Sequence, residues 1–120
     1  MCDERELIRG NTPTMILAVL RDAPQHGYAI LGEVNRRVGD ALKFKQGTLY
    51  PVLYALEQDG MVVAEWQHPE GERPRKVYTI TPAGRAELER RVSAWDRFTT
   101  AMGRVIAPRT EGGVPDGQPA

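Results

Sequence analysis

The change in hydrophobic period along the chain most constrains what these 120 residues can fold into. Three segments, 13–22, 26–38 and 46–59, repeat their apolar residues every three or four positions, as amphipathic helices do. Two segments, 62–67 and 76–80, alternate apolar and polar residues, as strands do. The last segment, 82–106, is helical again. The predicted fold class is α+β, mainly α with a small β-hairpin.

Proline positions set the predicted ends of these helices. Thr12-Pro13 and Thr81-Pro82 both combine an N-cap residue with proline at the first helical position. Residues 1–11 are therefore predicted to form an N-terminal arm or a short helix. Pro51 must lie in the first turn of its helix, where the missing N–H costs nothing. Gly60 follows that helix as a natural C′ residue.

The order of helix, helix, helix, hairpin and helix is that of a winged helix-turn-helix domain, here over residues 12–81, followed by a further helix. In this fold the second and third helices form the DNA-reading pair, and the hairpin loop is the wing. The third helix carries Leu49, Leu53 and Leu56 on one side, which predicts that this side faces the core. Its opposite side would face DNA.

Charge is neutral overall but uneven along the chain. With 16 basic and 16 acidic residues and a pI near 6.7, the composition argues against indiscriminate nucleic-acid binding. Basic residues nevertheless gather before the third helix and beside the hairpin. They are Arg36, Arg37, Lys43, Lys45, Arg73, Arg75 and Lys76. Such a strip would contact phosphates, and the N-terminus of the third helix would add free N–H groups for one.

The outward side chains of the third helix are candidates for reading bases. They are Gln46, Thr48, Tyr50 and Tyr54. Glutamine can pair with adenine, and threonine or an aromatic ring can touch a thymine methyl group. Each candidate also has a plainer explanation. The two tyrosines could cover the edge of the core, Lys43 and Lys45 could be ordinary loop charges, and the basic wing could be a solvated hairpin tip.

The last helix predicts a homodimer. A helix over 82–106 spans about 37 Å, which is too long for the core of this chain to cover. Its apolar residues recur mostly four and three apart, in a seam of coiled-coil type. They are Leu88, Val92, Trp95, Phe98, Met102 and Val105. Residues 82–107 are therefore predicted to form a dimerisation helix, and the Pro- and Gly-rich residues 108–120 a disordered tail.

Other function classes find little support. The only histidines are His26 and His68 and the only cysteine is Cys2, so we expect no catalytic triad, no metal site and no cofactor. Acidic residues replace the apolar stretch that a signal peptide needs, and no apolar run is long enough to cross a bilayer, so we expect a cytoplasmic protein. A winged helix used as a protein-interaction module remains the rival, although the basic wing argues against it.

Four blocks in order resemble the PadR family of transcriptional regulators. The most specific is Gly47-Thr48-Leu49-Tyr50-Pro51; the others include His26-Gly27-Tyr28, Arg75-Lys76-Val77-Tyr78 and Ala83-Gly84-Arg85. The likeness covers residues 12–106 and is to the short-form members. It implies a homodimer that binds a palindromic operator in double-stranded DNA, usually as a repressor. It also implies DNA contacts for Tyr28, Thr48, Tyr50, Pro51, Arg73, Arg75 and Lys76.

The chain departs from this pattern at one point. Many members have Ser-Pro where this sequence has Lys45-Gln46, so this pair could supply contacts of its own. Some members sense planar aromatic compounds at the dimer interface, and Trp95 is the residue that would face such an effector. The simpler interpretation is that Trp95 belongs to the dimer core.

Overall fold

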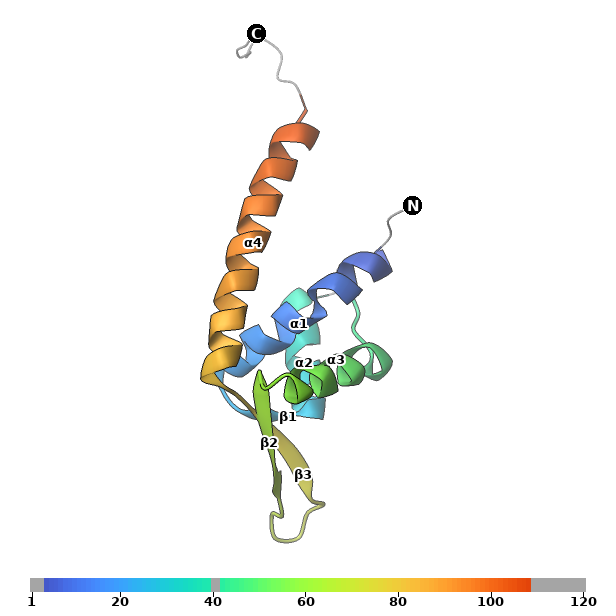
Figure 1. The fold of residues 1–120 in the computed structure, drawn as a ribbon. Helices are drawn as coiled ribbons and strands as arrows, with labels where there is room; N and C mark the ends of the chain where they lie inside the picture. Colours follow the sequence, from blue (N-terminus) through green and yellow to red (C-terminus); the bar gives the residue numbers. More distant parts are fainter. Residues whose placement is uncertain (1–3, 40–41, 109–120) are drawn as a thin grey trace.

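The computed structural model describes residues 4–39 and 42–108, and in these ranges it has four helices and three strands (Figure 1). Their order is α1 (Glu4–Asp22), β1 (Gln25–His26), α2 (Gly27–Val38), α3 (Gln46–Gln58), β2 (Val62–Gln67), β3 (Arg75–Ile80) and α4 (Pro82–Ile106). The α+β winged-helix architecture predicted from the sequence is confirmed.

The first helix begins earlier than the sequence predicted. Thr12 and Pro13 lie inside α1 rather than at its start, so the predicted helix start at Thr12-Pro13 is wrong. The Thr12 side chain is buried, and its hydroxyl donates a hydrogen bond to the Ile8 carbonyl oxygen at 2.5 Å. Ile8 packs against the core, which ties the preceding turns to the domain. Of the predicted arm, residues 4–11 therefore belong to α1, and residues 1–3 lie outside the described part.

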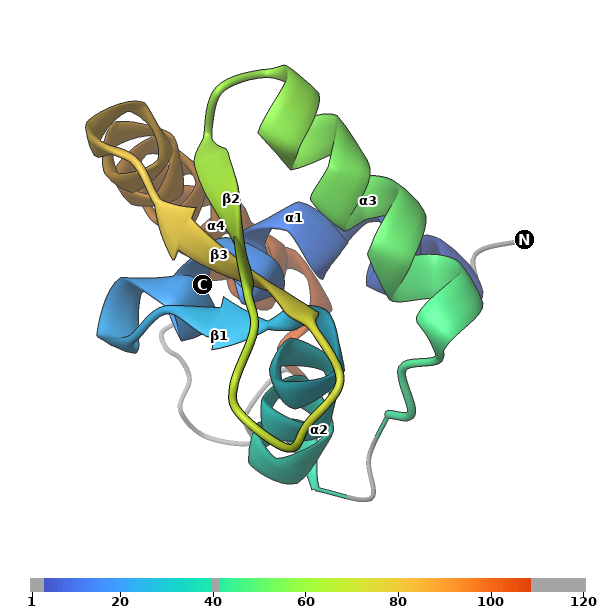
Figure 2. The same ribbon diagram turned by 90° about the horizontal axis from the view of Figure 1, so that it is seen from below.

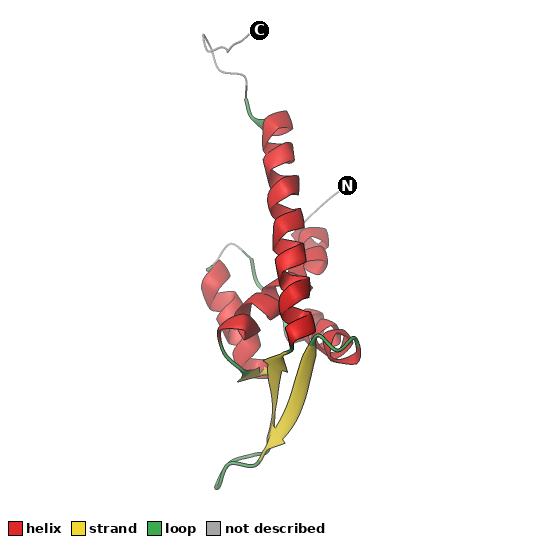
Figure 3. Cartoon of the chain, turned by 60° about the vertical axis from the view of Figure 1, so that its left-hand side comes forward, coloured by secondary structure: helices red, strands yellow, loops and turns green. Residues whose placement is uncertain are grey.

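The sheet has one strand more than the predicted hairpin. Its order is β1-β3-β2, and both pairings are antiparallel. β2 and β3 pair from Val62 opposite Ile80 to Gln67 opposite Arg75. β1 adds Gln25 opposite Tyr78 and joins the chain between α1 and α2 to the base of the wing. Figures 1 and 3 show the hairpin extending from the helices, with its loop at the far end.

The core lies between α1, α2, α3 and the base of the sheet (Figure 2). As predicted, the apolar side of α3 faces it: Leu49 and Leu53 are fully buried and Leu56 nearly so. The other buried apolar side chains include Ile16, Leu17, Leu20, Ile30, Val34, Phe44, Val62, Tyr78, Ile80 and Leu88. This packing leaves the opposite side of α3 and the wing free to meet a partner.

α4 starts where the second Thr-Pro pair predicted and then leaves the domain. Thr81 caps it by accepting a hydrogen bond from the Gly84 N–H at 2.9 Å. Leu88 is only 2% exposed and packs inside its own protomer, so its predicted role in the dimer interface is wrong. Beyond it the helix projects from the body (Figures 1 and 3). Of the predicted tail, residues 109–120 lie outside the described residues.

The helices of residues 4–39 and 42–108 include none that is both long and apolar enough to cross a membrane.

Candidate nucleic-acid interface

The first turn of α3 is open to solvent. Lys45 occupies the N-cap position with extended backbone, and its carbonyl oxygen accepts hydrogen bonds from the N–H groups of Thr48 and Leu49, both at 3.0 Å. The Lys45 side chain makes no capping bond and is exposed, as are Gln46 and Gly47. The departure at Lys45-Gln46 therefore leaves the turn without a side-chain cap, and the N–H groups of the exposed Gln46 and Gly47 lie at the open end of the helix. This arrangement suits a phosphate.

Asn35 sets the position of this turn. Its side-chain amide donates to the Phe44 carbonyl oxygen at 3.0 Å, and its side-chain oxygen accepts from the Phe44 N–H at 2.8 Å. Phe44 is itself 2% exposed, so the residues just before α3 are anchored both by burial and by a paired hydrogen bond. No sequence pattern indicates this role, because the partners are nine residues apart across a connection without a periodic pattern. Lys43, which precedes Phe44, is exposed on this connection.

Aromatic and basic side chains meet between α2, α3 and the wing. They line a hollow of about 620 Å³ formed by His26, Gly27, Tyr28, Tyr50, Tyr54, Trp66, Arg73, Pro74, Arg75, Lys76 and Tyr78. The hollow brings together six residues predicted to bind DNA: Tyr28, Tyr50, Tyr54, Arg73, Arg75 and Lys76. Lys43, Lys45, Gln46, Thr48 and Pro51 are not part of its lining. All but Lys43 lie on or beside the first two turns of α3. Pro51 is the sixth residue of α3, inside the helix, so the prediction that it lies in the first turn is wrong.

Tyr50 lies at the centre of the aromatic group. Its ring is half-buried, and its centroid is 6.1 Å from that of Tyr54. Burial raises the pKa of the Tyr50 hydroxyl, and the neighbouring Tyr54 and Tyr28 raise it further. Gly27 makes room for the ring, since a Cβ on Gly27 would lie 2.5 Å from Cε1 of Tyr50. Tyr50 therefore both packs on the start of α2 and remains accessible, while Tyr28 and Tyr54 are more exposed.

Trp66 is a residue of this face that the sequence analysis did not select. It lies on β2 opposite Lys76, and 62% of its surface is exposed. The strand alternation placed it on one face with Ala64 but did not indicate which face. The pairing with Lys76 supplies that information, because opposite residues of an antiparallel pair share a side of the sheet.

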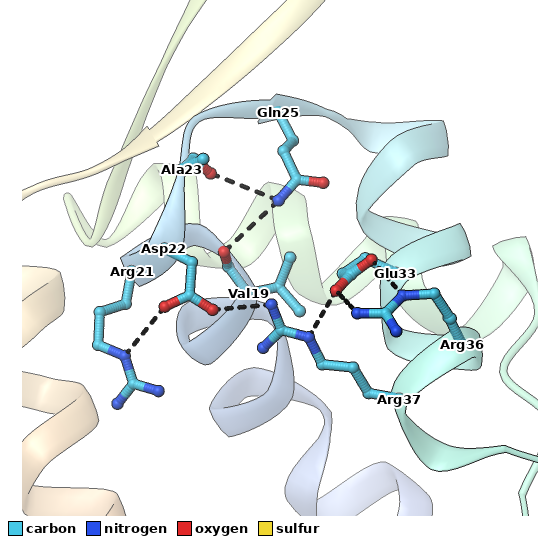
Figure 4. Close-up of polar contacts among 8 residues, drawn as sticks. All are labelled: Val19, Arg21, Asp22, Ala23, Gln25, Glu33, Arg36 and Arg37. Atoms are coloured by element: carbon cyan, nitrogen blue, oxygen red, sulfur yellow. Dashed lines mark hydrogen bonds and ion pairs between the residues drawn. The ribbon is translucent and has the colours of Figure 1, made fainter.

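The charge of the face is smaller than predicted, because Arg36 and Arg37 are engaged elsewhere (Figure 4). Both donate to the Glu33 carboxylate, and Arg37 also donates to Asp22 of α1 at 2.7 Å. The hydrogen bonds from Arg36 and then Arg37 lower the pKa of Glu33 to about 2. Arg37 thus joins α2 to α1, whereas Arg36 is paired within α2. Acidic neighbours offset the charges of both arginines, so the predicted basic strip does not extend to them.

The wing keeps its exposed cations. Arg73 and Arg75 are both exposed, and Nη1 of Arg75 is 3.7 Å from Oε1 of Glu72, a loose pair at the loop. Lys76 differs, since its ammonium nitrogen donates to Oε1 of Glu57 on α3 at 3.1 Å. Arg73 and Arg75 are therefore exposed cations beside the aromatic rings of the hollow, and Lys43 and Lys45 are exposed just before α3.

His26 has a structural task. Its Nδ1 accepts a hydrogen bond from the Ala29 N–H at 3.3 Å, which caps α2. Across the described ranges, no three His, Cys, Asp or Glu residues are grouped so that they could hold a metal ion.

Comparison with known proteins identifies the family of this chain. The model of the "Transcriptional regulator PadR-like family" matches residues 16–90. Transcriptional regulator Rv3488 of Mycobacterium tuberculosis is 40% identical over 84 residues, which cover 70% of this chain and 75% of that protein.

Two solved structures extend the likeness to three dimensions. A PadR family regulator from Eggerthella lenta shares 29% identity and a TM-score of 0.76, over 87% of this chain and 88% of that one. Bacillus subtilis PadR, solved in complex with operator DNA, shares 26% identity and a TM-score of 0.61, over 67% of this chain and 45% of that one. On the family match and the identity with the mycobacterial regulator, this chain belongs to the PadR-like family of transcriptional regulators.

Proposed function

We propose that this regulator binds a palindromic operator as a homodimer and represses transcription by occupying a promoter in the cytoplasm. Regulators of this family are DNA-binding proteins and not enzymes. The observation that carries the proposal is the hollow where α3, the start of α2 and the wing meet, with exposed cations around accessible aromatic rings. The B. subtilis relative, which was solved with operator DNA, has the same fold over this domain.

The proposed contacts divide by role. Lys43, Lys45, Arg73 and Arg75 would bind phosphates and set the register on the duplex. Gln46, Thr48 and Pro51 lie on the first turns of α3, where base edges in a major groove come within reach. Tyr50, Tyr54 and Tyr28 would supply apolar contacts beside them, such as a contact with a thymine methyl group.

The direct test is selection of bound duplexes from random sequence, combined with sedimentation of the free protein. We expect enrichment of a palindrome with two half-sites about one helical turn apart, and a dimer in sedimentation. A failure to enrich any sequence would instead favour a winged-helix protein-interaction module without DNA binding.

The two exposed arginines of the wing give a prediction for the salt dependence of DNA binding. Replacing Arg73 or Arg75 by glutamine should reduce the slope of log affinity against log salt by about one for each arginine, because one phosphate contact releases about one counterion. Arg104→Gln, at the exposed end of α4, is the control and should leave the slope unchanged. The slope is measured by fluorescence anisotropy on the selected duplex. An unchanged slope in both wing variants would remove the wing from the interface.

The dimer is proposed from an apolar surface that the protomer leaves uncovered. Leu7, Met15, Leu42, Val92, Trp95 and Phe98 line a groove of about 470 Å³ between α1 and α4. Met102 and Val105 continue the exposed apolar side chains along α4. An apolar patch of this extent marks an interaction site in a soluble protein, and a second α4 has the matching seam. Trp95 is 51% exposed in the groove, so a small aromatic effector entering the interface would meet it there.

Substitution of Trp95 by glutamate should convert the dimer to a monomer, because a charge would be buried without a partner in the interface. Affinity for the palindrome should fall at least tenfold, since the two half-sites would then be bound independently. Thr100→Glu places the same charge on an exposed position of α4 outside the groove and should leave the dimer intact. Sedimentation at micromolar concentration distinguishes the two. A dimeric Trp95→Glu variant would place the interface elsewhere.

A further inference from the structure

Lys76 lies on β3 at the base of the wing, where the wing meets α3, rather than at the tip of the wing. Its ammonium nitrogen is 3.1 Å from Oε1 of Glu57 and 5.6 Å from the ring centroid of Tyr54, both on α3. It is also 5.4 Å from the ring centroid of Tyr78, on its own strand. One cation therefore has a carboxylate and two aromatic rings as neighbours, and these neighbours come from two different elements.

The geometry of each element explains why these four side chains meet. Tyr54 and Glu57 are three residues apart on α3 and share one side of the helix. Lys76 and Tyr78 are two residues apart on β3 and share one face of the sheet. Each element thus contributes one aromatic ring and one charged side chain to the contact, and the two charges are of opposite sign.

The charge of Lys76 is already satisfied within the protein. The Lys76 side chain is 30% exposed and that of Glu57 is 32% exposed, so this ion pair is more sheltered than the Arg75–Glu72 pair, at 45% and 61%. The hydrogen bond with Glu57 raises the pKa of Lys76, which keeps the ammonium charged. A DNA phosphate would compete with Glu57 and with the rings of Tyr54 and Tyr78 for the ammonium group of Lys76.

We propose that Lys76 is a positioning residue. With Glu57 and Tyr54 it fixes the base of the wing against α3. It thereby sets the position of Arg73 and Arg75 relative to the first turn of α3, the turn proposed to contact the DNA bases. This assignment replaces the phosphate contact that the sequence predicted for Lys76. It rests on the proposed DNA binding, because the spacing of wing and helix matters only for a ligand that spans both.

The first experiment needs no DNA. Amide hydrogen exchange of the β2–β3 hairpin is compared in wild type, Lys76→Met, Glu57→Gln and the charge-exchanged double variant Glu57→Lys, Lys76→Glu. We expect faster exchange, by at least threefold, in both single variants and partial recovery in the double variant. Glu72→Gln, which removes only the loose partner of Arg75, is the control and should exchange like wild type at the base of the hairpin. If the hairpin of Lys76→Met exchanged its amide hydrogens as slowly as that of wild type, the contact would not fix the wing and the proposal would be overturned.

The second experiment uses the selected duplex across a series of salt concentrations. Lys76→Met should weaken binding by about tenfold while leaving the slope of log affinity against log salt unchanged. Arg75→Gln, in contrast, should lower the slope by about one. A lower slope in Lys76→Met would show that Lys76 itself contacts a phosphate and would overturn the proposal. If wild type binds no duplex, the proposed function fails and the positioning role fails with it, whereas the exchange data still decide whether the contact holds the wing.

Discussion

Gly84→Ala is expected to destabilise the domain by about 3 kcal/mol, because overpacking of a site that cannot yield costs about that much. A Cβ on Gly84 would lie 2.1 Å from the carbonyl oxygen of Met61 and 2.8 Å from Cγ1 of Ile80. The Met61 oxygen cannot move freely, since it accepts a hydrogen bond from the Thr81 N–H at 3.0 Å. It also lies 3.0 Å from the Thr81 hydroxyl, whose single hydrogen it shares with the Gly60 carbonyl oxygen at 2.7 Å. The added methyl group would therefore separate α4 from the base of the sheet.

Urea unfolding measures this cost, and Gly32→Ala is the matched control. Gly32 is exposed in α2, and a Cβ there would meet no atom within 4 Å. Alanine should stabilise that helix by up to about 1 kcal/mol. Equal stability of Gly84→Ala and wild type would show that α4 can shift away from Met61, contrary to this expectation.

Gly27→Ala is expected to reduce operator affinity at least tenfold while changing stability by less than about 1 kcal/mol. Here the added Cβ would lie 2.5 Å from Cε1 of Tyr50 and 3.0 Å from its hydroxyl oxygen. Because these atoms are at the far end of a side chain that is not fully buried, the ring can move and the fold can survive. The moved ring would no longer hold its place beside Tyr28 and Tyr54 in the hollow proposed to bind DNA.

A double-mutant cycle separates displacement of the Tyr50 ring from other causes of weaker DNA binding. In a Tyr50→Ala background the Gly27→Ala change should cost no further affinity, because the ring that it displaces is gone. Gly10→Ala, in α1 with no atom within 4 Å of the added Cβ, should bind DNA like wild type. If Gly27→Ala lowered the affinity for DNA equally in wild type and in the Tyr50→Ala variant, the loss would not come from displacement of the Tyr50 ring.

Local sequence signals predicted the helices well only where tertiary packing agreed with them. Thr81-Pro82 and Thr12-Pro13 carry the same start signal, yet only the first starts a helix. Thr81 caps α4 at the surface, whereas Thr12 is 1% exposed and bonds back to Ile8 within a longer helix. The pair of residues cannot distinguish these outcomes, because the deciding factor is whether Ile8 finds a place against the core.

The sequence predicted which residues belong to the candidate site, but not which side chains pair with one another. The spacing of Leu49, Leu53 and Leu56 orients α3, and so it also indicates that Tyr50 and Tyr54 point outward. The partner of Lys76 is 19 residues away on another element, and the partners of Arg36 and Arg37 are acidic residues that the charge pattern placed on no particular face. Periodicity reports which side a residue faces, whereas ion pairs depend on how separate elements pack.

The most direct measurement is the affinity of the wild-type protein for the selected palindrome and for a scrambled duplex, over a series of salt concentrations. DNA reading by α3 and the wing predicts at least about a thousandfold preference for the palindrome. It also predicts that log affinity falls steeply and linearly with log salt. Equal affinity for both duplexes, or a flat response to salt, would contradict it and point to a protein partner on this face.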